Sequence, residues 1–287
     1  MNALATVSIR RHRTDKFMRW AFLAGLLLAF IPLVLVLLFV IIRGAGALSL
    51  SFFTTDPTGA FFGDQGGIKS AILGTLEIVG LAAAIAVPIG IALAVYLNEI
   101  GRKSRLASLV RYFVDVLTGV PSIVFGLFIY TVLVVSGLFG GFAAWKGSVA
   151  LALLMLPVVT RASEVSLTLV PDNLREAALA LGAPRWRMIT SVVLPTALPG
   201  LLTGSLLAIA RASGETAPLL FTVLGAQATT FSLGAQMNSL PLQIFNDVRE
   251  PNPQLVTRAW GAALTLITII LLINIVARLA ARRSNLR

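Results

Sequence analysis

The sequence predicts an all-α, polytopic membrane protein with six transmembrane helices. Of its 287 residues, 57% are hydrophobic and only 12% are charged, and the mean hydropathy is +0.91. A soluble domain of this composition would expose large apolar patches and aggregate. A bilayer core needs about 20 helical residues. The stretches that reach this length are 20–42, 69–97, 109–137, 147–170, 194–222 and 257–280.

The first predicted span follows a basic tail that covers residues 1–19. The apolar run from Trp20 to Ile42 is too long for the core of a signal peptide and has no small-residue cleavage site after it. We therefore expect an uncleaved first helix, followed by an outer loop, over residues 20–65.

Prolines interrupt several of the later predicted spans, at Pro88, Pro121, Pro157 and Pro218. Each proline removes a backbone hydrogen bond from its helix, which at membrane depth is tolerated only against protein or a water-filled cavity. The second, third and fifth spans also exceed the minimum length, so we expect them to tilt or kink. Broken helices of this kind indicate a transport path.

Positive charges gather on one side of the predicted topology. Seventeen of the 23 Lys and Arg residues lie in the N-terminal tail, in or beside the loops after the second and fourth spans, and at the C-terminal end, whereas five lie on the other side and Arg211 lies between. This bias predicts that the first side, with both termini, is cytoplasmic. The net charge of +11 therefore reflects membrane topology, and we expect no nucleic-acid partner.

The composition also restricts the chemistry. The chain has no Cys, and its single His, His12, lies in the polar tail, which excludes thiol chemistry and His-based metal sites. No G-x-x-x-x-G-K-[ST], H-E-x-x-H or G-x-S-x-G pattern occurs. We therefore expect no metal, no cofactor and no ATP hydrolysis in this chain, and any energy source must be a partner.

Arg211 and Glu215 are the most informative charges, because they lie four residues apart inside the fifth predicted span. A charge at mid-bilayer costs about 2.5–3.5 kcal/mol. At i and i+4 the two side chains share one helix face, so each can partly neutralise the other. A guanidinium can replace the water around a tetrahedral oxyanion. Glu215 would then weaken the binding enough for release. A purely structural ion pair is the alternative that the sequence leaves open.

Four further residues are candidates for the substrate path. Arg161 and Glu164 form a pair at i and i+3 near the end of the fourth span, either as a brace for the following loop or as an exit contact for the anion. Glu77 has no partner nearby in the sequence, and Arg211 is its candidate partner across helices. Ser122 follows Pro121, where a broken helix can present backbone N–H groups to an anion.

The predicted cytoplasmic loop 171–195, PDNLREAALALGAPRWRMITSVVLP, has structure of its own. We expect Asp172 or Asn173 to cap a helix, and Gly182 to end it with a positive φ. A second short helix, 185–193, then leads into the fifth span. The first helix would carry an apolar face made of Leu174, Ala177, Ala178 and Leu181. A short apolar face on a cytoplasmic loop is typical of a segment that inserts into a partner's groove.

The order Glu176-Ala177-Ala178, Gly182 and Leu194-Pro195 resembles the EAA loop of ABC importer permeases, with Val192 where that family usually has Ile. The resemblance implies a type I ABC importer permease fold. It also implies that this helix docks in a cleft of a separate ATP-hydrolysing subunit, where Glu176 would anchor it.

Three more stretches narrow the resemblance: GGIKSAILGTLEI (66–78), GVPSIVFGLF (119–128) and RASGETAPLLFT (211–222). Together with the EAA loop they are similar to the A-type permease subunits of bacterial phosphate-specific ABC transporters. The similarity begins at about Gly66, which predicts a permease domain over 66–280 and a cytoplasmic tail over 281–287, whereas residues 1–65 match in topology only.

This resemblance implies half of a translocation path for inorganic phosphate in the bacterial inner membrane. The implied partners are a second homologous permease, two ATPase subunits that bind ATP-Mg on the cytoplasmic side, a phosphate-binding protein outside and membrane lipid. A permease for another oxyanion, such as sulfate or molybdate, is the alternative. A secondary carrier or a membrane enzyme is less favoured.

Overall fold

The computed structural model describes residues 9–59, 63–137 and 139–284, with side chains from 13 to 279. The described part is all-α, as predicted, apart from one isolated bridge between Pro57 and Gly66. Its helices are α1 (Ile9–Ala45), α2 (Leu50–Thr54), α3 (Lys69–Val95), α4 (Arg105–Gly119), α5 (Ser122–Ile129), α6 (Ala144–Thr168), α7 (Asp172–Ala180), α8 (Arg185–Met188), α9 (Leu194–Ser213), α10 (Ala217–Thr222), α11 (Leu240–Arg249) and α12 (Pro253–Ser284). Three π-helical segments, η1 (Tyr96–Ile100), η2 (Tyr130–Val135) and η3 (Ile189–Val193), continue α3, α5 and α8.

Five helical stretches of the described chain are long and apolar enough to cross a membrane: Arg13–Ala45, Lys69–Ile100, Ala144–Thr168, Arg185–Ser213 and Pro253–Leu279. A sixth span exists only if α4 and the segment Ser122–Val135 are counted together, and these two are bent by 103°. The predicted third span, over 109–137, is thus present as two helices, with the predicted break at its proline.

The bend follows from Pro121. The residue before a proline is pushed out of the α region, and Val120 accordingly has φ −74° and ψ 130°. The helix stops at Gly119 and restarts at Ser122. The turned helix α5 then packs on α10, where a side chain at Gly126 would come within 2.6 Å of the Pro218 Cα.

The fifth predicted span, 194–222, is also divided. Helix α9 ends at Ser213, the next three residues are not helical, and α10 is a separate short helix from Ala217. The membrane-length element extends instead in the other direction, through η3 and α8, to Arg185. The predicted short helix over 185–193 is confirmed as α8 and η3.

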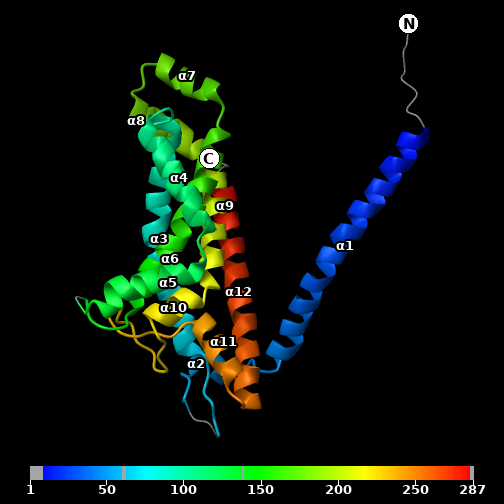
Figure 1. Ribbon diagram of the computed structural model, residues 1–287, viewed down its shortest axis with the longest axis vertical. Coiled ribbons are helices and arrows are strands. Elements are labelled where there is room, and N and C mark those ends of the chain that lie inside the picture. Colours follow the sequence, from blue (N-terminus) through cyan, green and yellow to red (C-terminus); the bar gives the residue numbers. More distant parts are fainter. Residues whose placement is uncertain (1–8, 60–62, 138, 285–287) are drawn as a thin grey trace.

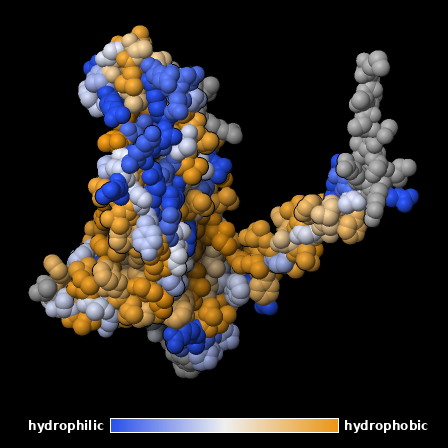
Figure 2. Space-filling view, turned by 45° about the horizontal axis from the view of Figure 1, so that its top comes forward, coloured by the Kyte–Doolittle hydropathy of each residue, from blue (hydrophilic) through white to orange (hydrophobic). Residues whose placement is uncertain are grey.

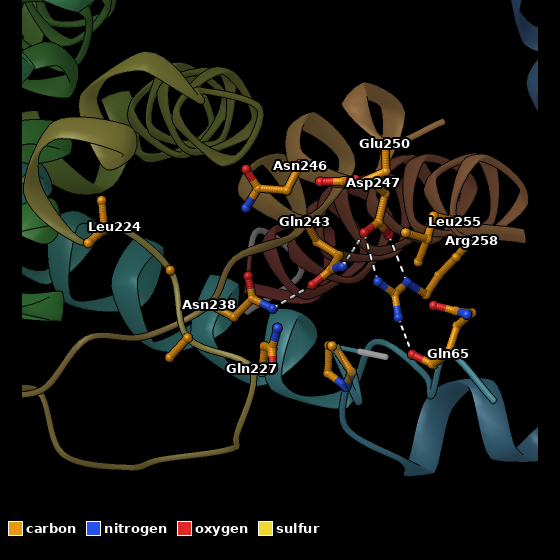
Figure 3. A pocket seen from close by; sticks show the side chains of 14 residues that line it. Gln65, Leu224, Gln227, Asn238, Gln243, Asn246, Asp247, Glu250, Leu255 and Arg258 are labelled. Atoms are coloured by element: carbon orange, nitrogen blue, oxygen red, sulfur yellow. Dashed lines mark hydrogen bonds and ion pairs between the residues drawn. The ribbon is translucent and has the colours of Figure 1, made fainter. Parts of the chain in front are cut away.

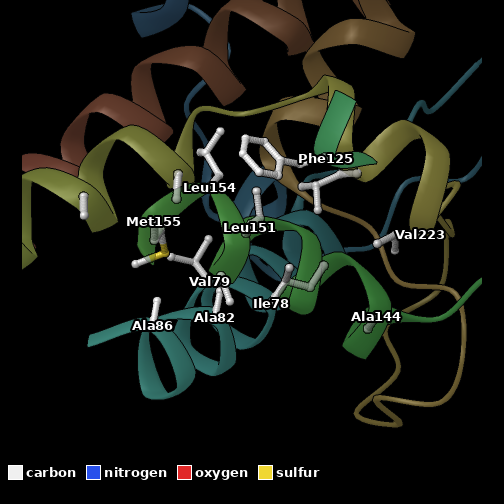
Figure 4. Close-up of a cluster of buried hydrophobic side chains, with 14 of the residues drawn as sticks. Ile78, Val79, Ala82, Ala86, Phe125, Ala144, Leu151, Leu154, Met155 and Val223 are labelled. Carbon is white, nitrogen blue, oxygen red and sulfur yellow. The ribbon is translucent and has the colours of Figure 1, made fainter. Parts of the chain in front are cut away.

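The core lies between α3 and α6, which pack along most of their length. In Figure 4, Ile78, Val79, Ala82 and Ala86 face Leu151 and Met155 in one buried cluster. Small residues allow this close approach. Gly90, for example, leaves no room for a side chain, because a Cβ there would lie 2.8 Å from the Val159 side chain.

The helices are arranged so that α7, α8, the start of α1 and the end of α12 lie at one end of the molecule (Figure 1). We call this the coupling end, because it carries the loop 171–195, which is predicted to dock on a partner subunit. The opposite end, which carries α2 and α11, is the far end. Helix α1 leans away from the bundle and meets α12 near its own C-terminus, where Phe39 and Trp260 stack edge to face with centroids 5.1 Å apart. Most of its apolar surface is exposed.

Candidate functional site

A network of four charged side chains joins α4 to α6 near the coupling end. Arg161 Nη1 lies 2.7 Å from Glu164 Oε2, so this predicted pair is present in the structure. Arg161 Nε also donates to Asp115 Oδ1 at 2.8 Å, and Arg111 Nε donates to Glu164 Oε1 at 2.6 Å. Each arginine therefore has a carboxylate on the other helix. Figure 2 shows hydrophilic residues in a band that runs from the coupling end toward the middle of the bundle, with hydrophobic residues on both sides.

Sequence reasoning missed Arg111 and Asp115 as partners of this network. Their i and i+4 spacing on α4 indicates a pair within one helix, yet each contacts α6 instead. The two cations and two anions balance, so an incoming anion would have to displace a carboxylate to reach Arg161. In the geometry of this structure the network braces α4 against α6.

Arg211 lies in the last turn of α9 and is exposed on the surface of the chain. Because the helix ends at Ser213, Glu215 is not on the same helical face, and the two side chains form no ion pair. The expected i, i+4 pair is therefore wrong. Ser213 and Thr203 hydroxyls donate to carbonyls of their own helix, at 2.7 and 2.8 Å.

Two other cations inside membrane-length helices differ from Arg211, because they are buried and hydrogen-bonded. Lys146, which has no exposed surface, donates to the carbonyls of Leu133, Gly140 and Gly141 at 2.6–2.8 Å. Arg258 is held by Asp247. Of these cations, Arg211 is the one available to a ligand or a partner.

Glu77 and Ser122 are placed apart from these charges. Glu77 is half-buried on α3 and forms no ion pair with a described residue, so the expected pairing with Arg211 is wrong. Ser122 is the first residue of α5, directly after the 103° bend. Its backbone N–H is one of those that a helix start leaves without an internal acceptor.

The predicted coupling helix is present as α7. Asp172 does not cap it as expected, because Pro171 is the N-cap residue and the Asp172 carboxylate accepts from Arg175 Nη1 at 3.0 Å instead. The predicted stop at Gly182 is confirmed, with φ +80°. The N–H groups of Gly182 and Ala183 donate to Leu179 and Ala178 carbonyls at 2.9 and 3.1 Å. This is a Schellman motif, which requires the left-handed residue.

Much of the apolar surface at the coupling end lies open. Leu181 is 89% exposed and Trp186, on α8, is 62% exposed. Glu176 and Ala177 are also exposed, whereas Ala178 and Leu194 pack against a buried cluster that includes Val193. The remaining residue of the loop pattern, Pro195, is exposed in the first turn of α9. An apolar face of this kind fits a groove on a second protein.

Arg175 fixes this loop to the bundle, and sequence reasoning missed it. Its guanidinium binds the Glu99 carboxylate with two hydrogen bonds, of 2.8 and 3.2 Å, and also donates to the carbonyls of Leu167 and Val170 at 2.8 and 2.6 Å. The bonds to Glu99 raise the pKa of Arg175 above its ordinary value, against the effect of burial. The two residues lie 76 positions apart, so no local pattern could reveal the pair.

The far end holds a polar pocket of about 380 Å³, lined by residues from the two outer loops, α11 and α12 (Figure 3). Arg258 binds Asp247 there through two hydrogen bonds, of 2.7 and 2.8 Å, and Gln243 links Asp247 to Asn238. Because Asp247 neutralises Arg258 and Glu250 adds a negative charge, this pocket does not favour an anion. The loop expected over 223–256 thus contains a helix and buried polar residues.

The two outer loops are also joined directly. The backbone N–H and hydroxyl of Thr229 donate to the Asp56 carboxylate at 2.9 and 2.5 Å. Burial raises the pKa of Asp56, but these hydrogen bonds and the nearby Lys69 outweigh it and hold the pKa below its ordinary value. This contact therefore ties the second outer loop to the first at Asp56.

The fold and the coupling loop define the class of protein. Residues 86–286 match the family model described as the binding-protein-dependent transport system inner membrane component, and the chain belongs to this family. Within it, the chain is 43% identical over 258 residues to the phosphate transport system permease protein PstA of Yersinia pestis, covering 89% of this chain and 86% of that protein. It is 42% identical over 287 residues to PstA 1 of Mycobacterium tuberculosis strain H37Rv, covering 98% of this chain and 92% of that protein.

Solved structures agree on the fold. The MetNI methionine ABC transporter in an inward-facing conformation matches with a TM-score of 0.60 at 20% identity, covering 76% of this chain and 94% of the other. A bacterial ABC transporter for import of the acidic polysaccharide alginate matches with a TM-score of 0.64 at 18% identity, covering 95% of this chain and 99% of the other. The chain is thus a multi-pass membrane protein with the fold of ABC importer permeases.

Proposed function

We propose that this chain is the permease subunit of an ATP-driven importer of inorganic phosphate, in which it forms half of the translocation path. The observation that carries the proposal is its identity of more than 40%, over most of both lengths, to proteins named as phosphate transport permeases. Helix α7, with its exposed apolar residues, would couple the chain to the ATPase. The unpaired Arg211 would contact phosphate on the translocation path.

Arg211 is the residue that we assign to the substrate. It is a permanent cation within a membrane-length helix, it is exposed on this chain, and it has no carboxylate partner among the described residues. A phosphate ion carries one to two negative charges and three or four oxygen acceptors, which match the paired N–H donors of a guanidinium. A second, homologous permease placed against this face would enclose Arg211 in a shared path.

Arg161 and Glu164 take a structural role, although between two helices and not as a brace for the following loop. Because Asp115 and Arg111 complete a neutral network with them, we assign them to the joint between α4 and α6 rather than to direct phosphate binding. Glu77 and Ser122 stay candidates for the wall of the path, since neither is bonded to another described charge. The start of α5 at Ser122 can offer backbone N–H groups to an anion.

The coupling end would face the cytoplasm, with both termini, in accordance with the distribution of Lys and Arg. The exposed apolar residues of α7, with Glu176, would dock into a separate ATPase subunit, which would bind ATP-Mg. A phosphate-binding protein would dock at the far end. This chain itself supplies no nucleotide site in the proposal.

The test is transport by the complete complex reconstituted in vesicles. We expect uptake of radiolabelled phosphate that requires ATP inside the vesicle and the binding protein outside, and no comparable uptake of sulfate. Equal uptake of sulfate would favour the other-oxyanion alternative. Phosphate uptake that continues without ATP would contradict an ABC importer.

A further inference from the structure

Helix α7 packs on η3 and α8, and one side chain, Arg175, bonds it to the rest of the bundle. Most of its apolar residues are exposed, including Leu174 and Leu179, and Ala178 alone packs against a buried cluster. By contrast, each of the five guanidinium N–H groups of Arg175 has an acceptor: two on Glu99, two on backbone carbonyls of Leu167 and Val170, and one on Asp172. Arg175 is therefore the hydrogen-bonded joint between α7, η1 and the end of α6.

The other end of the attachment is η1, the π-helical continuation of α3. The Glu99 side chain is only 5% exposed. Its Oε1 also accepts from Asn98 at 2.8 Å, and Asn98 in turn accepts from Thr168 on α6 at 3.3 Å. A two-point bond between planar groups fixes orientation as well as distance, so a rotation of α7 must act on η1.

Segment η1 also supports the charge network between α4 and α6. The carbonyl of Leu97 accepts from Arg111 Nη2 at 2.7 Å, and the same guanidinium binds Glu164. Leu97 and Glu99 lie two residues apart on one π-helical turn, a rare geometry that is frequent at functional sites. A continuous series of contacts thus runs from Arg175 through Glu99, η1, Arg111 and Glu164 to Arg161.

We propose that Arg175 is a positioning residue for coupling, which joins α7 to η1 so that the two move as one body. A displacement of α7 by the ATPase then reaches the Arg111–Glu164–Arg161 network through η1, and changes how α4 lies against α6. This inference rests on the proposed function, and names the contact through which ATP hydrolysis would act on the path.

The first test is the number of phosphate ions transported per ATP hydrolysed by the reconstituted complex. Arg175→Gln removes the charge and the paired donors while keeping a polar side chain. We expect this ratio to fall at least tenfold while ATP is still hydrolysed. The matched control is Arg102→Gln, an exposed arginine next to η1 that forms no ion pair, and it should leave the ratio unchanged.

A merely structural brace predicts a different result. Uptake and ATP hydrolysis would then fall together, in proportion to the amount of assembled complex, and an unchanged ratio in Arg175→Gln would overturn the proposal. If Arg175→Gln fails to assemble, Glu99→Gln gives the same comparison, because it keeps the side-chain shape and one acceptor oxygen.

A second measurement needs no transport, and so separates failure of this inference from failure of the proposed function. Spin labels at Asn173→Cys on α7 and Lys103→Cys directly after η1 report the distance between the two segments, and the chain has no other Cys. In the chain that keeps Arg175, we expect this distance to be the same in the nucleotide-free and the ATP-bound complex. In Arg175→Gln, we expect it to differ between these two states. A distance that already changes with nucleotide in the native pair would overturn the proposal.

Discussion

Arg211 and Glu215 are four residues apart in the sequence but form no ion pair, because Arg211 lies within α9 and Glu215 follows its last residue. The N–H groups of Gly214 and Glu215 donate to the Arg211 and Ala212 carbonyls at 3.2 Å, so the chain leaves the helix between the two charges. The arginine is therefore not neutralised by the acid nearest to it in sequence. Its removal strands no partner within the described chain.

This relationship makes the role of Arg211 testable with single substitutions. We expect Arg211→Gln to assemble normally but to lower phosphate uptake roughly ten- to a hundredfold, because hydrogen bonds to charged groups contribute about 1.5–3 kcal/mol. Uptake by Arg211→Lys should be intermediate, since an ammonium keeps the charge but lacks the paired N–H donors of a guanidinium. Arg102→Gln, at an exposed arginine outside the proposed path, is the matched control and should retain most uptake. Normal uptake by Arg211→Gln would leave Arg211 without a substrate role.

Gly182 gives a second prediction, on the coupling loop alone. A β-branched residue at φ +80° costs about 1–2 kcal/mol, and Gly182→Val should therefore distort the end of α7. We expect the variant to reach the membrane but to lose the ATPase subunit on purification. Gly182→Asn should keep it, because Asn tolerates the left-handed region. Equal recovery of the ATPase with the Val and Asn variants would contradict this role of the glycine.

The orientation can be checked with an impermeant thiol reagent, because the chain has no Cys of its own. Cys in place of Ser51, which is exposed at the far end, should react in intact cells. Cys in place of Lys103, exposed at the coupling end, should react only after the membrane is opened. Asn238, although it lies in the predicted outer loop, is a poor position because it is buried. Reaction at residue 103 in intact cells would reverse the topology.

The buried pair at the far end predicts a stability effect. Arg258→Met would leave the Asp247 carboxylate buried and unpaired, which costs about 3–5 kcal/mol. We expect a marked fall in the thermal unfolding midpoint of the detergent-solubilised chain. Arg249→Met is the matched control, because Arg249 is exposed and contacts only the Phe245 ring among charged or aromatic partners. Similar midpoints for the two variants would mean that the pair is not important for stability.

The fold class and the coupling loop could be predicted from the sequence because their signals are local. Apolar run length reports membrane spans, and the positive φ at Gly182 follows from a glycine placed after an Ala-rich helix. The proline at position 121 predicts a break in the third span, but it does not predict that the two helices meet at 103°. Its size depends on where α10 lies, and no residue near Pro121 reports that.

The candidate site was less accessible to sequence reasoning, because its contacts are long-range. Arg111 and Asp115 have the spacing of an in-helix pair, but α6 offers each of them a better placed partner. Arg211 and Glu215 failed for the opposite reason, since the helix that would have brought them together ends too early. Spacing predicts a contact only while the helix is known to continue, and competing partners are invisible until the helices are packed.

The sharp elbow between α4 and α5 has a consequence for biosynthesis. Helix α4 has 15 residues, so it reaches about 22 Å and is too short to cross a bilayer alone. Helix α5 can reach its final position only when α10 is present to receive Gly126, and α10 is synthesised after α6 to α9. The contact with α10 that holds the elbow can therefore form only late in synthesis.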